Sequence, residues 1–134
     1  LDNSYQRIGS GMIGELPEAI KPTDFLADLK AKMQTNCVRY TALPKRKIRK
    51  IAVCGGVGSF LLPKAISQGA DVFVTSDYKY HQFFDANNQI VIADIGHYES
   101  EQFTVELFYD LLTKKFSNFE PVLSSINTNP IKYL

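Results

Sequence analysis

The sequence has few of the residues that usually build metal sites and disulfides. It contains two histidines, His81 and His97, and two cysteines, Cys37 and Cys54. The cysteines lack the CxxC spacing of a zinc site, and Cys54 ends an apolar run, where a free cysteine behaves as a small hydrophobic side chain. We therefore expect no disulfide. A catalytic metal centre usually takes three protein ligands, so this chain alone can barely complete one.

Strong net charge and long apolar runs are also absent. The formal net charge is +1, so the composition gives no reason to expect a nucleic-acid or membrane partner. The basic cluster KRKIRK, residues 45–50, is interpreted as the solvent-exposed beginning of a strand, with phosphate or nucleic-acid contact as the alternative. No apolar run approaches the roughly 20 residues of a membrane span. The polar N-terminal stretch has no signal-peptide pattern, and the expected location is the reducing cytoplasm.

What the sequence does contain is an alternation of strand and helix patterns that begins near residue 47. The patterns predict strands at 47–54, 70–76 and 90–96 and helices at 60–69, 78–89 and 99–116. This alternation predicts βαβ units with right-handed crossovers. We therefore expect a layered α/β fold, with a mainly parallel sheet flanked by helices, and a single domain over residues 1–134.

The flanking segments are less regular. Residues 4–16 are glycine-rich and predict a loop or an irregular strand. A helix is expected at 21–33, capped by Thr23, a half-buried strand at 37–43 and a last strand at 121–126. The longest helix has a stripe at helical spacing that we expect to be buried, and it consists of Phe103, Leu107, Leu111 and Leu112.

Polar residues gather just after each of the three expected parallel strands. The segments are CGGVGS at 54–59, TSDYKYH at 75–81 and DIGHYESE at 94–101. In open α/β sheets, ligands bind beyond the carboxyl ends of the strands. The three segments are therefore expected to share one pocket.

The first two segments offer candidate substrate contacts. In CGGVGS, Gly55, Gly56, Gly58 and Ser59 could let the backbone approach an anion or substrate at a helix start, although the segment is neither a GxGxxG nor a P-loop motif. The alternative is a tight turn with Ser59 as a helix cap. In TSDYKYH, Asp77 could cap the next helix or face the pocket. His81 could act there as an acid or base, or it could simply be exposed.

The third segment offers the candidate metal ligands. If a helix begins near His97, then His97 and Glu101 lie four residues apart on one helix face. Imidazole and carboxylate suit Zn, Mn, Fe or Co, whereas the alternative is a helix start followed by a solvated acid. Glu99 points elsewhere and suits the N-terminal end of the helix dipole. A third ligand would have to be Asp94, Asp77 or His81.

Three segments in this order resemble the C-terminal part of the Nif-three-like proteins, which are also described as GTP cyclohydrolase I type 2-like. They are IGSGMIGEL, KIAVCGGVGSFLLPKAISQGADVFVTSDYKYHQFFDA and IVIADIGHYESE, and the final NTNPIKYL is similar too. The resemblance covers about residues 5 to 134. It implies an α/β fold in which two divalent metal ions share a site, often within a toroidal homohexamer.

The resemblance also implies where the ligands come from. The Gly-His-x-x-x-Glu motif of the family corresponds to His97 and Glu101, with Glu101 as a possible bridge between two metals. The other family ligands, a His-His pair and an Asp, lie in an N-terminal half. This sequence has no His-His pair, so we expect it to be the C-terminal portion of a longer protein.

The resemblance implies a metal-dependent hydrolase acting on a small molecule, with a nucleotide such as GTP as the candidate substrate. His81 is then the candidate proton donor or acceptor, and the CGGVGS segment and Asp77 would contact substrate. The isolated chain is expected to be inactive. One alternative is a non-enzymatic metal-binding module for regulation or protein interaction, and another is an inert structural half. The identity of the metal stays open.

Overall fold

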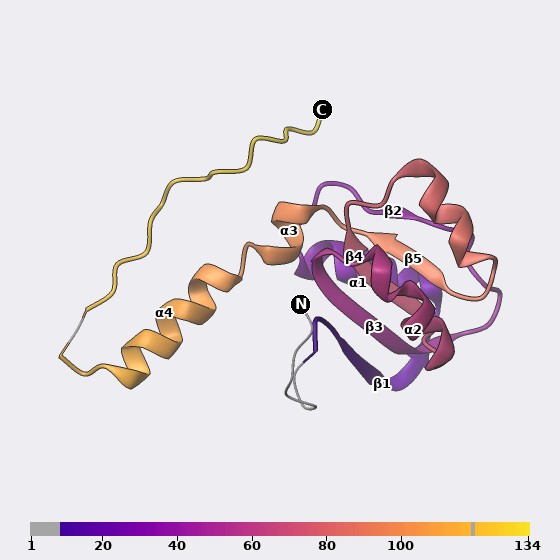
Figure 1. Cartoon of the computed structure of the whole chain (residues 1–134), viewed down its shortest axis with the longest axis horizontal. Coiled ribbons are helices and arrows are strands. Elements are labelled where there is room, and N and C mark those ends of the chain that lie inside the picture. The colour runs from indigo at the N-terminus through magenta and orange to yellow at the C-terminus, as the bar shows by residue number, and fades with distance from the viewer. Residues whose placement is uncertain (1–8, 119) are drawn as a thin grey trace.

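A five-stranded mixed sheet forms the centre of the computed structural model, which describes residues 9–118 and 120–134 (Figure 1). Its strands are β1 Met12–Ile20, β2 Arg39–Tyr40, β3 Ile48–Val57, β4 Val72–Ser76 and β5 Val91–Asp94. The order across the sheet is β1-β3-β4-β5-β2. The three central strands are parallel, while β1 and β2 pair antiparallel with β3 and β5. The predicted α/β fold class is confirmed, and its sheet has antiparallel edges.

Helices cover both faces of this sheet. The helices of the structure are α1 Pro22–Lys32, α2 Leu62–Ser67, α3 His97–Glu101 and α4 Thr104–Lys115, with short 3-10 helices η1 Ser59–Leu61 and η2 Tyr80–Ala86. Of these, α1 covers one face of the sheet and α2 with η2 cover the other. Successive strand residues point to opposite faces. Val74 and Val91 therefore pack with Phe25 of α1 on one face, whereas Phe73 packs in the core of Ala65 and Ala86, from α2 and η2, on the other.

The N-terminal part is more regular than its sequence suggested. The described part of the segment 4–16 enters edge strand β1, and residues 4–8 lie outside the described residues. Helix α1 begins at Pro22 after Lys21, and Thr23 donates to the neighbouring Asp24 carboxylate at 3.2 Å rather than capping the helix. The strand expected at 37–43 contains only two residues, and both are exposed.

The C-terminal part differs most from expectation. The helix expected at 99–116 is divided into α3 and α4, and Figure 1 shows α4 projecting away from the sheet. The prediction of a buried stripe was wrong: no α4 residue is buried against the described part of the chain, and Leu107, Leu111 and Leu112 are exposed. The helical period itself is found, since the residues 104–115 form one α-helix. Residues 121–126 form no strand.

None of the helices in the described ranges is long and apolar enough to cross a membrane.

Candidate functional site

The ends of the three parallel strands place four of the candidate residues together. Gly56 lies at the end of β3, Asp77 directly follows β4, and His97 begins α3 just after β5. Glu101 ends the same helix. The parallel pairing of these strands puts their carboxyl ends at one edge of the sheet. The predicted convergence of the three polar segments is therefore found for these four residues.

His97 lies between two carboxylates. Its ring nitrogen Nδ1 is hydrogen-bonded to the Asp77 carboxylate, and its Nε2 lies 3.3 Å from Glu101 Oε2. All three side chains are about half exposed. The hydrogen bond to Asp77 raises the pKa of His97 above its ordinary value, and the nearby charges of Asp77 and Glu101 add to this effect. Asp77 reaches the imidazole from a left-handed backbone conformation, with φ of 60°, which aspartate tolerates better than most residues.

Gly56 leaves the space that the Glu101 carboxylate occupies. Its φ is +63°, and a Cβ at this position would lie 2.5 Å from Glu101 Oε1 and 3.4 Å from His97 Cε1. Any larger residue would push this carboxylate away from the loop. The glycine segment thus contributes to the site by close approach of the backbone, which is the physical role expected of a glycine there.

Ser100 joins the glycine segment to α3. The Gly56 N–H donates to Ser100 Oγ at 2.9 Å, and the Ser100 hydroxyl donates to the His97 carbonyl at 2.8 Å. The analysis of the sequence missed this residue. Its position in the sequence could have indicated it, because a serine three residues after His97 on a helix can donate its hydroxyl to the His97 carbonyl.

The side chains present fit part of a divalent-metal centre. When Nδ1–H donates to Asp77, the lone pair of Nε2 is free to bind a metal on the side where Glu101 lies. Nitrogen and carboxylate oxygen are ordinary ligands of Zn and similar ions. In the described ranges, however, no three His, Cys, Asp or Glu side chains lie together so as to hold an ion. Asp77 is placed behind the imidazole as an orienting group.

The other two candidates for a third ligand, Asp94 and His81, form no ion-holding group with His97 and Glu101 in the described part of the chain. The buried Asp94 carboxylate accepts from Arg39 Nη2 at 2.5 Å, from the Tyr78 N–H at 2.9 Å and from the Gly96 N–H at 3.1 Å. These contacts give Asp94 a structural role. His81 is exposed on η2. Among the described residues, no hydrogen bond joins His81 to Asp77 or to His97.

The remaining residues of the glycine segment make packing and hydrogen-bond contacts with neighbouring elements. A Cβ on Gly58 would lie 2.2 Å from Thr75 Oγ1, and a Cβ on Gly55 would lie 3.5 Å from the Ser100 carbonyl. Ser59 does not cap a helix through its side chain, and its hydroxyl accepts from Gln82 Nε2 at 3.4 Å. Gly58 and Gly55 therefore allow the end of β3 to approach β4 and α3 closely, and Ser59 contacts η2.

Glu99 lies away from the His97 ring. Its buried side chain reaches toward the C-terminal residues, where Asn129 Nδ2 donates to Glu99 Oε1 at 3.4 Å. Burial raises the pKa of Tyr133, and the nearby Glu99 carboxylate raises it further. Glu99 therefore attaches the C-terminal residues to α3.

Comparisons with known proteins agree on one family. Residues 3–130 match the family model described as Duf34/NIF3 (NGG1p interacting factor 3). A GTP cyclohydrolase 1 type 2 homolog of Staphylococcus epidermidis is 40% identical in an alignment 136 residues long that covers 98% of this chain and 37% of the relative. The similarly named protein of Staphylococcus aureus (strain MSSA476) is 37% identical over 131 residues, covering 94% of this chain and 36% of the relative.

A solved structure gives the same result for the fold. The crystal structure of a Bacillus cereus protein related to NIF3 superimposes with a TM-score of 0.81 at 30% identity, and the match covers 100% of this chain and 38% of that one. The chain thus spans little more than a third of the length of the curated relatives it matches, 36% and 37% in the two staphylococcal proteins.

Proposed function

The chain belongs to the Duf34/NIF3 family, and from that premise we propose that it provides part of a divalent-metal centre in a metal-dependent hydrolase. One observation carries the proposal. The imidazole of His97 is oriented by Asp77 on one side and faces the Glu101 carboxylate on the other, beside a glycine that leaves room for that carboxylate.

Each residue of the candidate site has a defined role in this proposal. His97 and Glu101 are the metal ligands, and Asp77 fixes the imidazole tautomer and ring orientation so that Nε2 faces the metal. Ser100 and Gly56 hold α3 against the end of β3. A bound divalent metal would lower the pKa of a water molecule and polarise the substrate. His81 remains a candidate proton donor or acceptor, although it is exposed and apart from these residues.

The rest of the centre would come from polypeptide that the longer relatives contain. The matched region is 36% or 37% of those relatives, and two ligands are fewer than a catalytic centre usually has. We propose that the complete centre holds two ions, of Zn, Fe, Mn or Co, and forms within a homo-oligomer. The printed name of the relatives, GTP cyclohydrolase 1 type 2 homolog, supports a nucleotide as the candidate small-molecule substrate.

Metal binding by the chain tests the ligand assignment directly. We expect Zn²⁺ or Co²⁺ to bind weakly, as measured by competition with a chromophoric chelator, because only two ligands are present. His97→Ala and Glu101→Gln should each abolish this binding, whereas His81→Ala is the matched control and should leave it unchanged. Equal binding by the His97→Ala variant and the unaltered chain would contradict the assignment.

Turnover tests the hydrolase part separately. The full-length protein that contains this chain, loaded in turn with each of the four metals, should hydrolyse GTP or a simple phosphoester, and His97→Ala should remove that activity. Metal bound through His97 without turnover of any of these compounds would contradict the hydrolase while leaving the ligand assignment intact.

The second candidate is a non-enzymatic metal-binding module that interacts with other proteins. Two observations favour it: the family description names an NGG1p interacting factor, and α4 presents exposed Leu107, Phe108 and Leu111. In such a module the metal would stabilise structure or sense metal supply. The turnover experiment separates the two candidates, because only the hydrolase predicts a product.

A further inference from the structure

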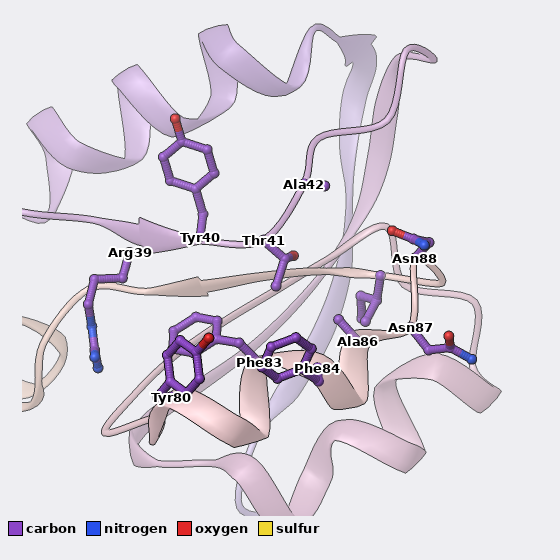
Figure 2. A pocket seen from close by; sticks show the side chains of 11 residues that line it. Arg39, Tyr40, Thr41, Ala42, Tyr80, Phe83, Phe84, Ala86, Asn87 and Asn88 are labelled. Atoms are coloured by element: carbon purple, nitrogen blue, oxygen red, sulfur yellow. The ribbon is translucent and has the colours of Figure 1, made fainter.

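A second concave site lies apart from the metal ligands, between strand β2 and helix η2 (Figure 2). We call it the aromatic pocket and define it by Arg39, Thr41, Tyr80, Phe84, Asn87 and Asn88. Its volume is about 620 Å³, which is within the range of small-molecule sites, roughly 300 to 1,000 Å³. None of the functions proposed above uses it.

Aromatic rings form one wall of the aromatic pocket. Tyr80 and Phe84 lie four residues apart on η2, with ring centroids 5.5 Å apart and ring planes at 77°. Their side chains remain 80% and 68% exposed, so they add little to the domain core. Phe83, between them in sequence, instead packs with the buried Tyr78 at a centroid distance of 5.4 Å. Exposed neighbouring rings provide a surface on which a planar apolar group can stack.

A guanidinium group with a fixed orientation lies at one end of the pocket. Arg39 Nη2 donates to Asp94 at 2.5 Å and to the Tyr78 carbonyl at 3.0 Å, and the group lies 5.4 Å from the Phe83 ring centroid. Within the described ranges no hydrogen bond uses Nε or Nη1 of Arg39. These N–H groups can donate to an acceptor in the pocket. Because Asp94 already balances the charge, a carbonyl oxygen is sufficient as that acceptor.

Carboxamides lie at the opposite end, as Figure 2 shows. Asn87 and Asn88 both have left-handed backbones, with φ of 42° and 54°, and both line the pocket. Each side chain offers donors and an acceptor. The aromatic pocket thus combines an apolar ring surface with hydrogen-bonding groups at both ends, which is the usual design of a site for a small organic ligand.

We propose that the aromatic pocket binds a small planar aromatic molecule that carries a carbonyl or carboxamide group. The ring would stack on the face of one of the two rings, Tyr80 or Phe84, and contact the other edge-on. Its carbonyl oxygen would accept from Arg39, and ring nitrogens or a second polar group would contact Asn87 and Asn88. This inference does not depend on a metal at His97.

A pair of probes of similar shape tests the proposal. Benzamide and cyclohexanecarboxamide carry the same amide group, but only benzamide has a planar aromatic ring. In ¹⁵N–¹H NMR titrations we expect benzamide to shift the signals of residues 80–88 and the side-chain amides of Asn87 and Asn88. Its affinity should be about tenfold higher than that of cyclohexanecarboxamide, because ring stacking is lost in the saturated probe.

Variants show whether the pocket itself is responsible. Replacing both Tyr80 and Phe84 by Ala should reduce benzamide affinity at least about tenfold. Phe60→Ala is the matched control, since Phe60 is 64% exposed but does not line the pocket. Asn87→Gly removes one carboxamide and keeps a residue that readily adopts positive φ, so a smaller loss of affinity is expected with unchanged dispersion of the spectrum.

Three results would overturn the proposal. The first is equal affinity for the two probes, and the second is full benzamide binding after both ring deletions. The third is a concentration-dependent shift of residues 80–88 without any probe, which would identify the aromatic pocket as a contact between copies of this chain.

Discussion

Every residue of β4 and β5 is buried, whereas every apolar side chain of α4 stays at least partly exposed. Both regions have a regular apolar pattern. The strands have layers of side chains above and below them, from α1 on one face and α2 with η2 on the other, but no α4 residue is buried against the described part of the chain. The comparison shows that a periodic pattern reports which face of an element is apolar, and not what covers that face.

The same contrast in burial exists between the candidate metal centre and helix α4, which follows it in the chain. Asp77 directly follows buried β4, and His97 comes three residues after the end of buried β5, so the two strands set their positions. Glu101 ends α3, and α4 begins shortly afterwards at Thr104 and leaves the sheet. The candidate metal ligands therefore lie on the well-packed side of this boundary.

The largest difference is expected from deleting equivalent apolar volume on the two sides. Ile92 in β5 is fully buried, while Leu111 in α4 is 53% exposed. Ile92→Ala should lower the free energy of unfolding by about 2–5 kcal/mol through lost burial and a cavity. Leu111→Ala should change it by less than about 0.5 kcal/mol. Urea unfolding measures both, and a large loss in the Leu111 variant would show that α4 is covered in solution.

A second prediction compares Gly14 in β1 with Gly58, which directly follows the neighbouring strand β3. A Cβ on Gly58 would lie 2.2 Å from Thr75 Oγ1 and 3.0 Å from Cys54 Cβ, whereas a Cβ on Gly14 would meet nothing within 4 Å. Gly58→Ala should therefore destabilise the chain by about 1–3 kcal/mol through overpacking, and Gly14→Ala should be close to neutral. Thermal unfolding of both variants provides the test. Equal stability would mean that the end of β3 is looser than its contacts indicate.

The third prediction concerns the two hydrogen bonds of Ser100 that join β3 to α3, which we call the clamp. Ser100→Ala removes the acceptor of the Gly56 N–H and the donor to the His97 carbonyl, which should cost about 1 kcal/mol of stability. Because the clamp sets the position of His97, the variant should also bind Zn²⁺ more weakly than the unaltered chain. Ser67→Ala is a suitable control, since its hydroxyl donates only to the Lys64 carbonyl within α2. Unchanged Zn²⁺ binding in the Ser100 variant would remove the positioning role.

Much of this arrangement could be predicted from the sequence, and the reasons for the exceptions are physical. Parallel strands end at a common edge, so the meeting of the Gly56, Asp77 and His97 segments followed from the strand pattern alone. The hydrogen bond from His97 to Asp77 did not, because it depends on a left-handed backbone at Asp77 that no periodicity reveals. The exposure of α4 was not predictable either, since an apolar stripe does not say what packs against it. The aromatic pocket combines β2 with η2, two segments far apart in sequence.

The smallest expected effect is on the titration of His97. The hydrogen bond to Asp77 raises the pKa of His97 in the folded chain, above the ordinary imidazole value of about 6.5 that applies to the unfolded chain. The protonated imidazole therefore stabilises the fold fully below that ordinary value, and the contribution disappears as the pH rises through the raised pKa.

Asp77→Asn tests this dependence with little change in shape, because asparagine also tolerates the left-handed backbone of this position. In the variant, the midpoint of the His97 Cε1–H signal in an NMR titration should move to lower pH. The loss of stability as the pH rises from the ordinary imidazole value through the raised pKa of His97 should become smaller at the same time. Since a proton and a metal compete for Nε2, Zn²⁺ binding by the unaltered chain should weaken as the pH falls through the raised pKa. An unchanged His97 midpoint in the variant would mean that Asp77 does not orient the imidazole, and the candidate centre would lose its most specific feature.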